Sequence, residues 1–176
     1  MNIIDMFRLD GRVALVTGAG RGLGQGMALG LAEAGADIAG LYSGTCAETK
    51  AAVEALGRRA LAVSGDVVDP EACTEAVRQA MAEFGRVDVL VNNAGIANTV
   101  PALREQPDEF RKVMDVNVNG TMWMAQACAR VMEPGSTIVN IASVLGMTSV
   151  LMPQAAYTAS KAAVIALTKD LAQQWT

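Results

Sequence analysis

The chain has 176 residues, enough for one domain, and 52% of them are apolar while only 18% are charged, which excludes a disordered protein. Its net charge of -4 lacks the basic excess that nucleic-acid binding requires. The absence of histidine excludes Ser-His-Asp catalysis, Cys-His catalysis and most zinc sites. Any acid–base chemistry must therefore come from Tyr, Lys, Asp or Glu.

The cysteines and the apolar runs bear on the compartment. Cys46, Cys73 and Cys128 are odd in number, widely spaced and free of any Cys-x-x-Cys pattern, which indicates unpaired thiols in a reducing compartment. No apolar run reaches the ~20 residues of a bilayer span. Residues 1–9 lack the basic segment and apolar core of a signal peptide. We therefore expect a cytoplasmic protein with neither a membrane nor a nucleic-acid partner.

Short apolar runs alternate with helix-forming segments along the whole chain. Strands are expected at residues 12–17, 37–42, 60–64, 87–91 and 136–142. Helices are expected at residues 27–34, 47–56, 70–84, 107–132 and 154–175. The strands are apolar on both faces, which is typical of parallel strands covered by helices. The alternation predicts one α/β domain over residues 1–176, a doubly wound parallel sheet with helices on both faces.

A glycine-rich turn follows the first expected strand and precedes the first expected helix. Glycine stands at every second position from Gly18 to Gly26. In a Rossmann-like sheet, backbone N–H groups and a helix N-terminus at this point face the pyrophosphate of a dinucleotide. The strict G-x-G-x-x-G spacing is absent, and Thr17-Gly18-x-x-x-Gly22-x-Gly24 stands in its place. Glycine turns occur in many folds, but the flanking strand and helix favour a dinucleotide-binding domain.

The end of the second expected strand bears on the choice between NAD and NADP. The carboxylate that usually holds the adenosine ribose is expected about 20 residues after the glycine turn. Tyr42-Ser43-Gly44 stands there, and the nearest acidic residue beyond it is Glu48. Without a carboxylate a 2′-phosphate is not repelled, and Arg21 in the glycine turn could pair with it. Arg21 could equally be an exposed surface charge. The sequence therefore favours NADP slightly but does not decide between NAD and NADP.

Tyr157 and Lys161 are four residues apart in an expected helix, so they lie on one face, one turn apart. A phenol has a pKa of about 10, and a nearby ammonium favours the phenolate and lowers that pKa. A tyrosine altered in this way can exchange a proton with a substrate oxygen. Taken alone, the spacing fits an ordinary pair on a surface helix better. The motifs upstream change that balance.

Six short motifs follow one another along the chain. They are Thr17-Gly18-Ala19-Gly20-Arg21-Gly22-Leu23-Gly24, Asp66-Val67, Asn92-Asn93-Ala94-Gly95, Asn117 within Asp115-Val116-Asn117-Val118-Asn119-Gly120, Ser143 within Ile141-Ala142-Ser143, and Tyr157-Thr158-Ala159-Ser160-Lys161. In this order and at these spacings they resemble the short-chain dehydrogenases/reductases over essentially the whole chain. Residues 22–35 are similar in particular to the sugar-acid dehydrogenases of that family, the 2-deoxy-gluconate and gluconate type.

The resemblance implies catalytic roles for four residues. Tyr157 would be the general acid/base, and Lys161 would lower its pKa and bind the nicotinamide ribose. Ser143 would hold and polarise the substrate oxygen. Asn117 would hold a water that links Lys161 to solvent. The alternatives are that Asn117 only satisfies backbone groups of its helix and that Ser143 is a small packing residue.

The resemblance also implies a set of cofactor-binding residues. Asp66 would accept a hydrogen bond from the adenine amino group beside the Val67 backbone, although a turn residue is the alternative for Asp66. The full set comprises Gly18, Arg21, Gly22, Leu23, Gly24, Ser43, Asp66, Val67, Asn93, Ala94, Gly95, Tyr157 and Lys161. No metal is expected.

The activity implied is hydride transfer between NAD(P) and a secondary alcohol or ketone of a small-molecule substrate, with Tyr157 moving the proton. One alternative is a 3-oxoacyl reductase of fatty-acyl or polyketide chemistry that uses NADPH. The other is a catalytically silent nucleotide-binding protein. Family members are commonly homotetramers or dimers, and the helices at residues 107–132 and 154–175 are the expected contacts between subunits.

The resemblance also predicts that the chain is the N-terminal part of a domain of about 250 residues. The expected last helix reaches Trp175 without a stop signal, and the family's sixth and seventh strands and substrate-covering segments have no counterpart. A sheet ended at its fifth strand exposes an apolar edge, so we expect residues 1–176 alone to be poorly soluble and inactive. Residues 96–104 and 144–152 would form part of the substrate pocket, and both are apolar or small.

Overall fold

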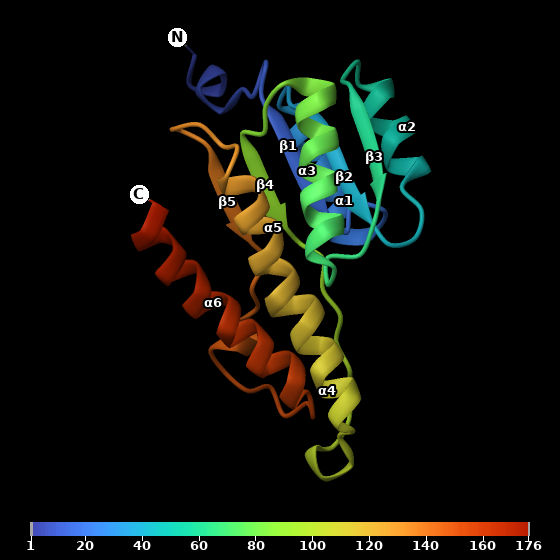
Figure 1. Ribbon diagram of the computed structural model, residues 1–176, viewed down its shortest axis with the longest axis vertical. Coiled ribbons are helices and arrows are strands. Elements are labelled where there is room, and N and C mark those ends of the chain that lie inside the picture. Colours follow the sequence, from blue (N-terminus) through green and yellow to red (C-terminus); the bar gives the residue numbers. More distant parts are fainter. Residues whose placement is uncertain (1, 176) are drawn as a thin grey trace.

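The computed structural model describes residues 2–175 and consists of a parallel sheet flanked by helices (Figure 1). The strands are β1 (Val13–Thr17), β2 (Asp37–Tyr42), β3 (Ala60–Ser64), β4 (Val89–Asn92) and β5 (Thr137–Asn140). The helices are α1 (Gly22–Glu33), α2 (Ala47–Ala55), α3 (Pro70–Phe84), α4 (Pro107–Met114), α5 (Gly120–Ala129) and α6 (Ala155–Trp175). Among residues 2–175 no helix combines the length and the apolar character that crossing a bilayer requires.

The strand order is β3-β2-β1-β4-β5, and each neighbouring pair is parallel. The chain therefore starts in the middle of the sheet, builds one half outward through β3 and then returns to build the other half. The strand order reverses between β1 and β4, so the loops leaving these two strands diverge. The predicted doubly wound parallel sheet is confirmed.

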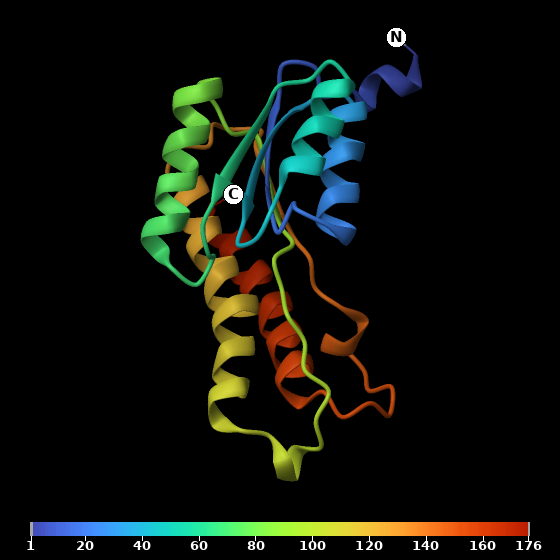
Figure 2. The ribbon, with the colours of Figure 1, turned by 90° about the vertical axis from the view of Figure 1, so that its right-hand side faces the viewer.

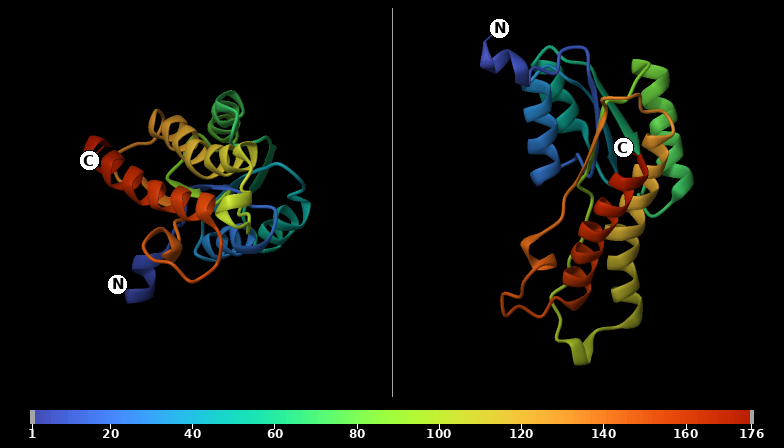
Figure 3. Two further views of the ribbon diagram at one scale, coloured as in Figure 1. Left: turned by 90° about the horizontal axis from the view of Figure 1, so that it is seen from below. Right: turned by 90° about the vertical axis from the view of Figure 1, so that its left-hand side faces the viewer.

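Two apolar layers hold the helices against the sheet. One buried cluster joins the sheet to α3, α5 and α6, and it includes Leu90, Met124 and Leu171. The other joins the opposite face to α1 and α2, and it includes Val16 and Ala28. Seen from below, the two sets of helices lie on opposite sides of the strands (Figure 3). Such burial on both faces explains why the strands read as continuous apolar runs.

The cysteines are buried and unpaired. Cys46, Cys73 and Cys128 are all free thiols, as the sequence predicted. Burial raises the pKa of Cys46 and raises that of Cys73 and Cys128 to about 12. These thiols are therefore protonated at neutral pH and serve as small core residues.

Two helix boundaries differ from the prediction. Helix α1 begins at Gly22 rather than at residue 27. Glycine is a poor helix former, so helix propensity alone did not predict a helix that begins among the glycines of this first turn. The expected helix at residues 107–132 ends at Ala129 and is interrupted by a π-helical turn, Asp115–Asn119. Such wider turns are frequently found at functional sites, and this one contains Asn117.

The loops at the carboxyl ends extend well below the sheet. After β4 and after β5 the chain runs down beside α4 and α6 before it turns back (Figure 2). The two loops meet in a parallel bridge between Val100 and Gln154, and the Val100 N–H donates to the Pro153 carbonyl at 2.8 Å. At the open side of the sheet, β5 is the edge strand and Val139 is 41% exposed.

Candidate functional site

A cleft of about 820 Å³ opens at the carboxyl ends of the strands, where the strand order reverses. This is the position at which doubly wound sheets bind ligands. The predicted site residues that line it are Gly18, Arg21, Leu23, Gly24, Ser43, Asp66, Val67, Asn93, Ala94, Gly95, Ser143, Tyr157 and Lys161. Gly22 and Asn117 were also predicted as site residues but do not line the cleft.

The turn between β1 and α1 depends on close backbone contacts. A Cβ on Gly24 would lie 2.2 Å from the Gly18 carbonyl oxygen and 2.5 Å from Nδ2 of Asn93. That Nδ2 donates to the Thr17 carbonyl at 3.0 Å, so the amide of Asn93 holds the turn. Gly18 and Gly22 have φ values of +67° and +58°, which glycine adopts without strain. Gly22 therefore shapes the start of α1 without facing the cleft.

Thr17 fixes the two diverging loops to each other. Its side chain is buried, and Oγ1 accepts hydrogen bonds from the backbone N–H groups of Asn93 and Ala94, both at 3.0 Å. The hydroxyl therefore joins the end of β1 to the end of β4 across the switch point. Thr17 belongs to the glycine motif of the sequence, but no role was predicted for it. A threonine between a buried strand and a glycine turn was the available signal.

Asp66 and Val67 follow β3 and line the cleft. Oδ1 of Asp66 also accepts the Val68 N–H at 3.2 Å, so the residue is in addition the turn residue that the sequence allowed as an alternative. A Cβ on Gly120 would lie 2.6 Å from Cγ2 of Val67. The glycine thus allows α5 to pack closely under this edge of the cleft.

The cleft carries more positive than negative charge. Among the lining residues that the structure describes, Arg21, Lys112 and Lys161 are cationic and Asp66 is the one carboxylate. Arg21 and Ser43 are exposed, and no acidic residue stands in the first turn of α1. A helix N-terminus without acidic side chains attracts anions. The geometry therefore suits a ligand that bears phosphate groups.

Tyr157 and Lys161 occupy the first turns of α6, on the same face. The Lys161 ammonium lies 5.7 Å from the centre of the Tyr157 ring and donates to the Ile141 carbonyl at 2.6 Å. The side chain of Lys161 is buried, and burial lowers the pKa of its ammonium. The two predicted catalytic side chains therefore lie close together and line the same cleft.

Ser143 lies just beyond β5 and precedes a 3-10 turn, Val144–Gly146. Its Oγ accepts the Leu145 N–H at 3.2 Å and lines the same cleft as Tyr157 and Lys161. The hydroxyl proton is thus available to a ligand oxygen. Ser143 is half-buried, which fits a contact residue better than a small packing residue.

Asn117 is almost fully buried in the π-helical turn. Its Oδ1 accepts the Ile96 N–H at 2.8 Å, while Nδ2 donates to the Ile96 carbonyl and to Ser160 Oγ, both at 2.9 Å. Ser160 Oγ in turn donates to the Tyr157 carbonyl at 2.7 Å. A Cβ on Gly95 would lie 3.3 Å from Asn117 Oδ1 and 3.6 Å from Lys161 Nζ, so glycine keeps the space between these groups open.

Several lining residues were not predicted. They are Leu41, Tyr42, Gly65, Lys112, Val116, Ile141 and Ala142, whereas Ile96 and Ala97 belong to the predicted pocket segment 96–104. Most are neighbours in sequence of predicted residues and face the cleft because they end the same strands. Lys112 is different because it comes from α4, and no motif marks it. The part of the chain that the structure describes contains no cluster of His, Cys, Asp or Glu able to hold a metal ion.

The chain has relatives among proteins of known family. The model of the short chain dehydrogenase family matches residues 12–176. A 2-dehydro-3-deoxy-D-gluconate 5-dehydrogenase of Dickeya dadantii is 44% identical over 98% of this chain and 69% of its own length. A 3-oxoacyl-[acyl-carrier-protein] reductase of Synechocystis is 37% identical over 96% of this chain and 70% of its own.

Solved structures have the same fold. The crystal structure of a short chain dehydrogenase from Burkholderia cenocepacia in complex with NADP superposes with a TM-score of 0.92. It is 39% identical, and the match covers 95% of this chain and 69% of the other. The resemblance to sugar-acid dehydrogenases that residues 22–35 indicated is confirmed by the Dickeya relative.

Proposed function

The chain belongs to the short-chain dehydrogenase family, and we propose that it transfers a hydride between NAD(P) and a secondary alcohol or ketone of a small substrate. One observation carries this proposal. A single cleft extends from the glycine turn at Gly18 to Tyr157 and Lys161 on α6. A cofactor bound along it and a substrate beside Tyr157 would share one site.

The residues of the cleft fit a dinucleotide. Its volume of about 820 Å³ lies within the range of ligand sites. Gly24 lies so close to the Gly18 carbonyl that any side chain at this position would force the turn beside the cleft open. Asp66 and Ser43 would hold the adenosine, and Lys161 would hold the nicotinamide ribose. When bound, the nicotinamide supplies the hydride chemistry that no side chain can provide.

The protein's own side chains would move the proton. The Tyr157 phenolate would take the proton from an alcohol, or the Tyr157 hydroxyl would give its proton to a ketone, and the neighbouring Lys161 ammonium would stabilise the phenolate form. Ser143 donates its hydroxyl proton to the substrate oxygen and fixes its position. The space that Gly95 leaves between Asn117 Oδ1 and Lys161 Nζ would admit the water of a proton relay.

We propose NADP as the preferred cofactor. Arg21 of the glycine turn and Ser43, which follows β2, both line the cleft, and no carboxylate follows β2 there to repel a 2′-phosphate. An arginine binds phosphate with paired N–H donors, which favours it over a neutral residue for this role. The Burkholderia relative in complex with NADP supports the preference.

Two substrate classes have specific support. A sugar acid or polyol is the first choice because of the Dickeya relative's name and its 44% identity. A 3-oxoacyl thioester is the second, because the Synechocystis relative is named for that reaction. The exposed apolar side chains Met147, Leu151 and Met152, which follow Ser143, would also suit an acyl chain. The net charge of -4 weighs against docking an acidic carrier protein.

The test is a turnover screen of the full-length protein with NAD, NADP and their reduced forms. The panel contains sugar acids, polyols and 3-oxoacyl thioesters, and the change in nicotinamide absorbance is followed. We expect turnover of a sugar acid or polyol, faster with NADP than with NAD. Turnover restricted to 3-oxoacyl thioesters would favour the second class. Cofactor binding without turnover of any compound would favour a silent nucleotide-binding protein.

Location and assembly complete the proposal. Free buried thiols suit the reducing cytoplasm, where we place the protein. We expect a homo-oligomer, a tetramer or a dimer, whose subunits meet through α4, α5 and α6. Light scattering on the full-length protein would measure the subunit number, and a monomer at working concentrations would contradict the assembly.

A further inference from the structure

The 3-10 turn Val144–Gly146 packs directly against α6, which begins at Ala155. The closest point of this packing is Gly146. A Cβ there would lie 2.7 Å from the carbonyl carbon of Lys161 and 2.8 Å from the backbone nitrogen of Ala162. These are atoms of a helix backbone, which cannot rotate away as the end of a side chain can.

The need for glycine at this position comes from the contact alone. Gly146 is absent from the residues with positive φ, so its backbone conformation is one that alanine adopts without strain. The backbone of Lys161 thus sets the distance between the turn and α6. An added methyl group would therefore force the turn away from the backbone of α6.

The same lysine also holds the chain on the other side of Ser143. Its Nζ donates to the Ile141 carbonyl at 2.6 Å, two residues before the serine, while its backbone supports Gly146, three residues after it. Within the turn, the Gly146 N–H donates to the Ser143 carbonyl at 3.0 Å. The segment that carries the Ser143 hydroxyl is therefore fixed to α6 at two points, both on Lys161.

We propose that Gly146 is a positioning residue that sets the placement of the Ser143 hydroxyl relative to Tyr157 and Lys161. This inference rests on the proposed dehydrogenase function. Gly146 touches neither the glycine turn nor the adenosine side of the cleft, so its effect is on the reaction and not on cofactor affinity. A displacement near 1 Å in a reacting constellation costs on the order of 100-fold in rate.

The first arm of the test compares Gly146→Ala with Gly30→Ala in the full-length protein. Gly30 is exposed in α1 and a Cβ there meets nothing within 4 Å, so it is the matched control. For Gly146→Ala we expect kcat to fall by about 10- to 100-fold while the Kd for the cofactor stays within about threefold. For Gly30→Ala we expect both values to match the unaltered protein.

The second arm is a double-mutant cycle with Ser143→Ala. Because Gly146 acts through the serine, Gly146→Ala should cost little further activity once the hydroxyl is gone, about twofold at most. An equal loss in both backgrounds, or no loss in the first, overturns the proposal. A Gly146→Ala protein that no longer binds the cofactor or melts at the assay temperature also overturns it, since the glycine then serves the fold.

The two proposals fail in distinguishable ways. An unaltered protein that turns over no alcohol or ketone contradicts the dehydrogenase function, and the positioning role of Gly146 falls with it. An active protein whose Gly146→Ala variant keeps its full kcat contradicts the positioning role alone.

Discussion

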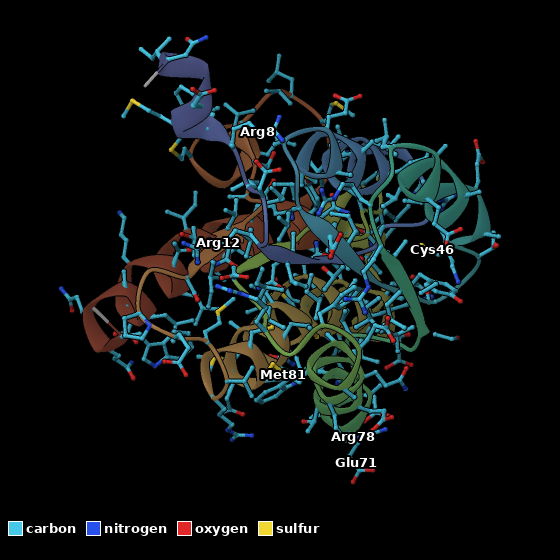
Figure 4. The ribbon with its side chains drawn as sticks, turned by 90° about the horizontal axis from the view of Figure 1, so that it is seen from above. Arg8, Arg12, Cys46, Glu71, Arg78 and Met81 are labelled. Atoms are coloured by element: carbon cyan, nitrogen blue, oxygen red, sulfur yellow. The ribbon has the colours of Figure 1, made fainter. Side chains whose placement is uncertain are left out.

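The two ends of the parallel sheet differ in how they use polar groups. At the amino ends, charged side chains pair with one another. The buried carboxylate of Asp88 accepts bonds from Arg12 at 2.7 Å, from Arg86 at 2.5 and 2.8 Å, and from the Val13 N–H at 2.9 Å. Arg12 lies at this end in the view from above (Figure 4). Asp37 at the start of β2 likewise pairs with Arg58.

At the carboxyl ends, neutral side chains bind the backbone and charged groups face the cleft. The Thr17 hydroxyl and the Asn93 and Asn117 amides each hold a loop through its N–H or carbonyl groups. Arg21 and Lys161 line the cleft instead. Charge at the amino ends is therefore paired within the protein, whereas charge at the carboxyl ends lies in the cleft, where a ligand could reach it.

The strongest way to break the carboxyl end is Gly24→Ala. The added Cβ would collide with the Gly18 carbonyl oxygen, 2.2 Å away, and with the Asn93 amide. The turn must then open, and we expect cofactor affinity to fall by at least about 100-fold, or about 3 kcal/mol. Titration calorimetry with NAD and NADP measures the loss. The Gly30→Ala control should bind normally, and normal binding by Gly24→Ala would contradict the role of the turn.

The link across the switch point is tested by Thr17→Val. Valine keeps the shape but leaves the N–H groups of Asn93 and Ala94 without their acceptor. We expect the free energy of unfolding to fall by about 3 kcal/mol and cofactor affinity to fall with it. Denaturant unfolding measures the first. Thr74→Val is the control, because that exposed hydroxyl donates only to a carbonyl of its own helix.

The amino end should respond in stability alone. Asp88→Asn removes the charge that two arginines share, and we expect a loss of about 2 kcal/mol in the free energy of unfolding. The Kd for the cofactor and kcat should not change, because the cleft lies at the other end. Asp10→Asn, in the exposed pair with Arg8, should leave stability nearly unchanged. A change in kcat for Asp88→Asn would show that the ends are not independent.

The contribution of Asp88 should also depend on pH. Burial acts to raise the pKa of this carboxyl, but hydrogen bonds from Arg86, Arg12 and the Val13 N–H lower it on balance. A pKa that is lower in the folded state means that the stabilisation is present above the ordinary value of 3.8 and is lost as the pH falls through the folded pKa. The free energies of unfolding of the unaltered protein and of Asp88→Asn should therefore converge as the pH falls below the folded pKa of Asp88. A difference that stays constant with pH would contradict the assignment.

The sequence was sufficient for the sheet and for most of the cleft. Apolar runs marked the strands, and the glycine turn, Asp66 and the Tyr157–Lys161 spacing follow directly from positions in the chain. What it could not supply were contacts between distant segments. The bonds of Thr17 to Asn93 and Ala94 depend on which strands become neighbours, and nothing local records that.

The helices were harder to predict where packing overrides propensity. Helix α1 begins at Gly22 because its first turn packs against the turn after β1. The low helix propensity of glycine argues against a helix that starts there. The π-helical turn around Asn117 depends on bonds to Ile96 and Ser160, which come from a loop and another helix. Lys112 lines the cleft only because α4, which carries it, packs beside the cleft in the folded chain.

We propose that the tyrosine and lysine of the cleft carry out proton transfer for a cofactor held by the glycine turn. The most direct measurement is Tyr157→Phe in the full-length protein, with turnover and cofactor Kd determined together. We expect kcat to fall by about 1,000-fold or more while the Kd stays unchanged within about threefold. A Tyr157→Phe protein that keeps a tenth or more of the original kcat would contradict it.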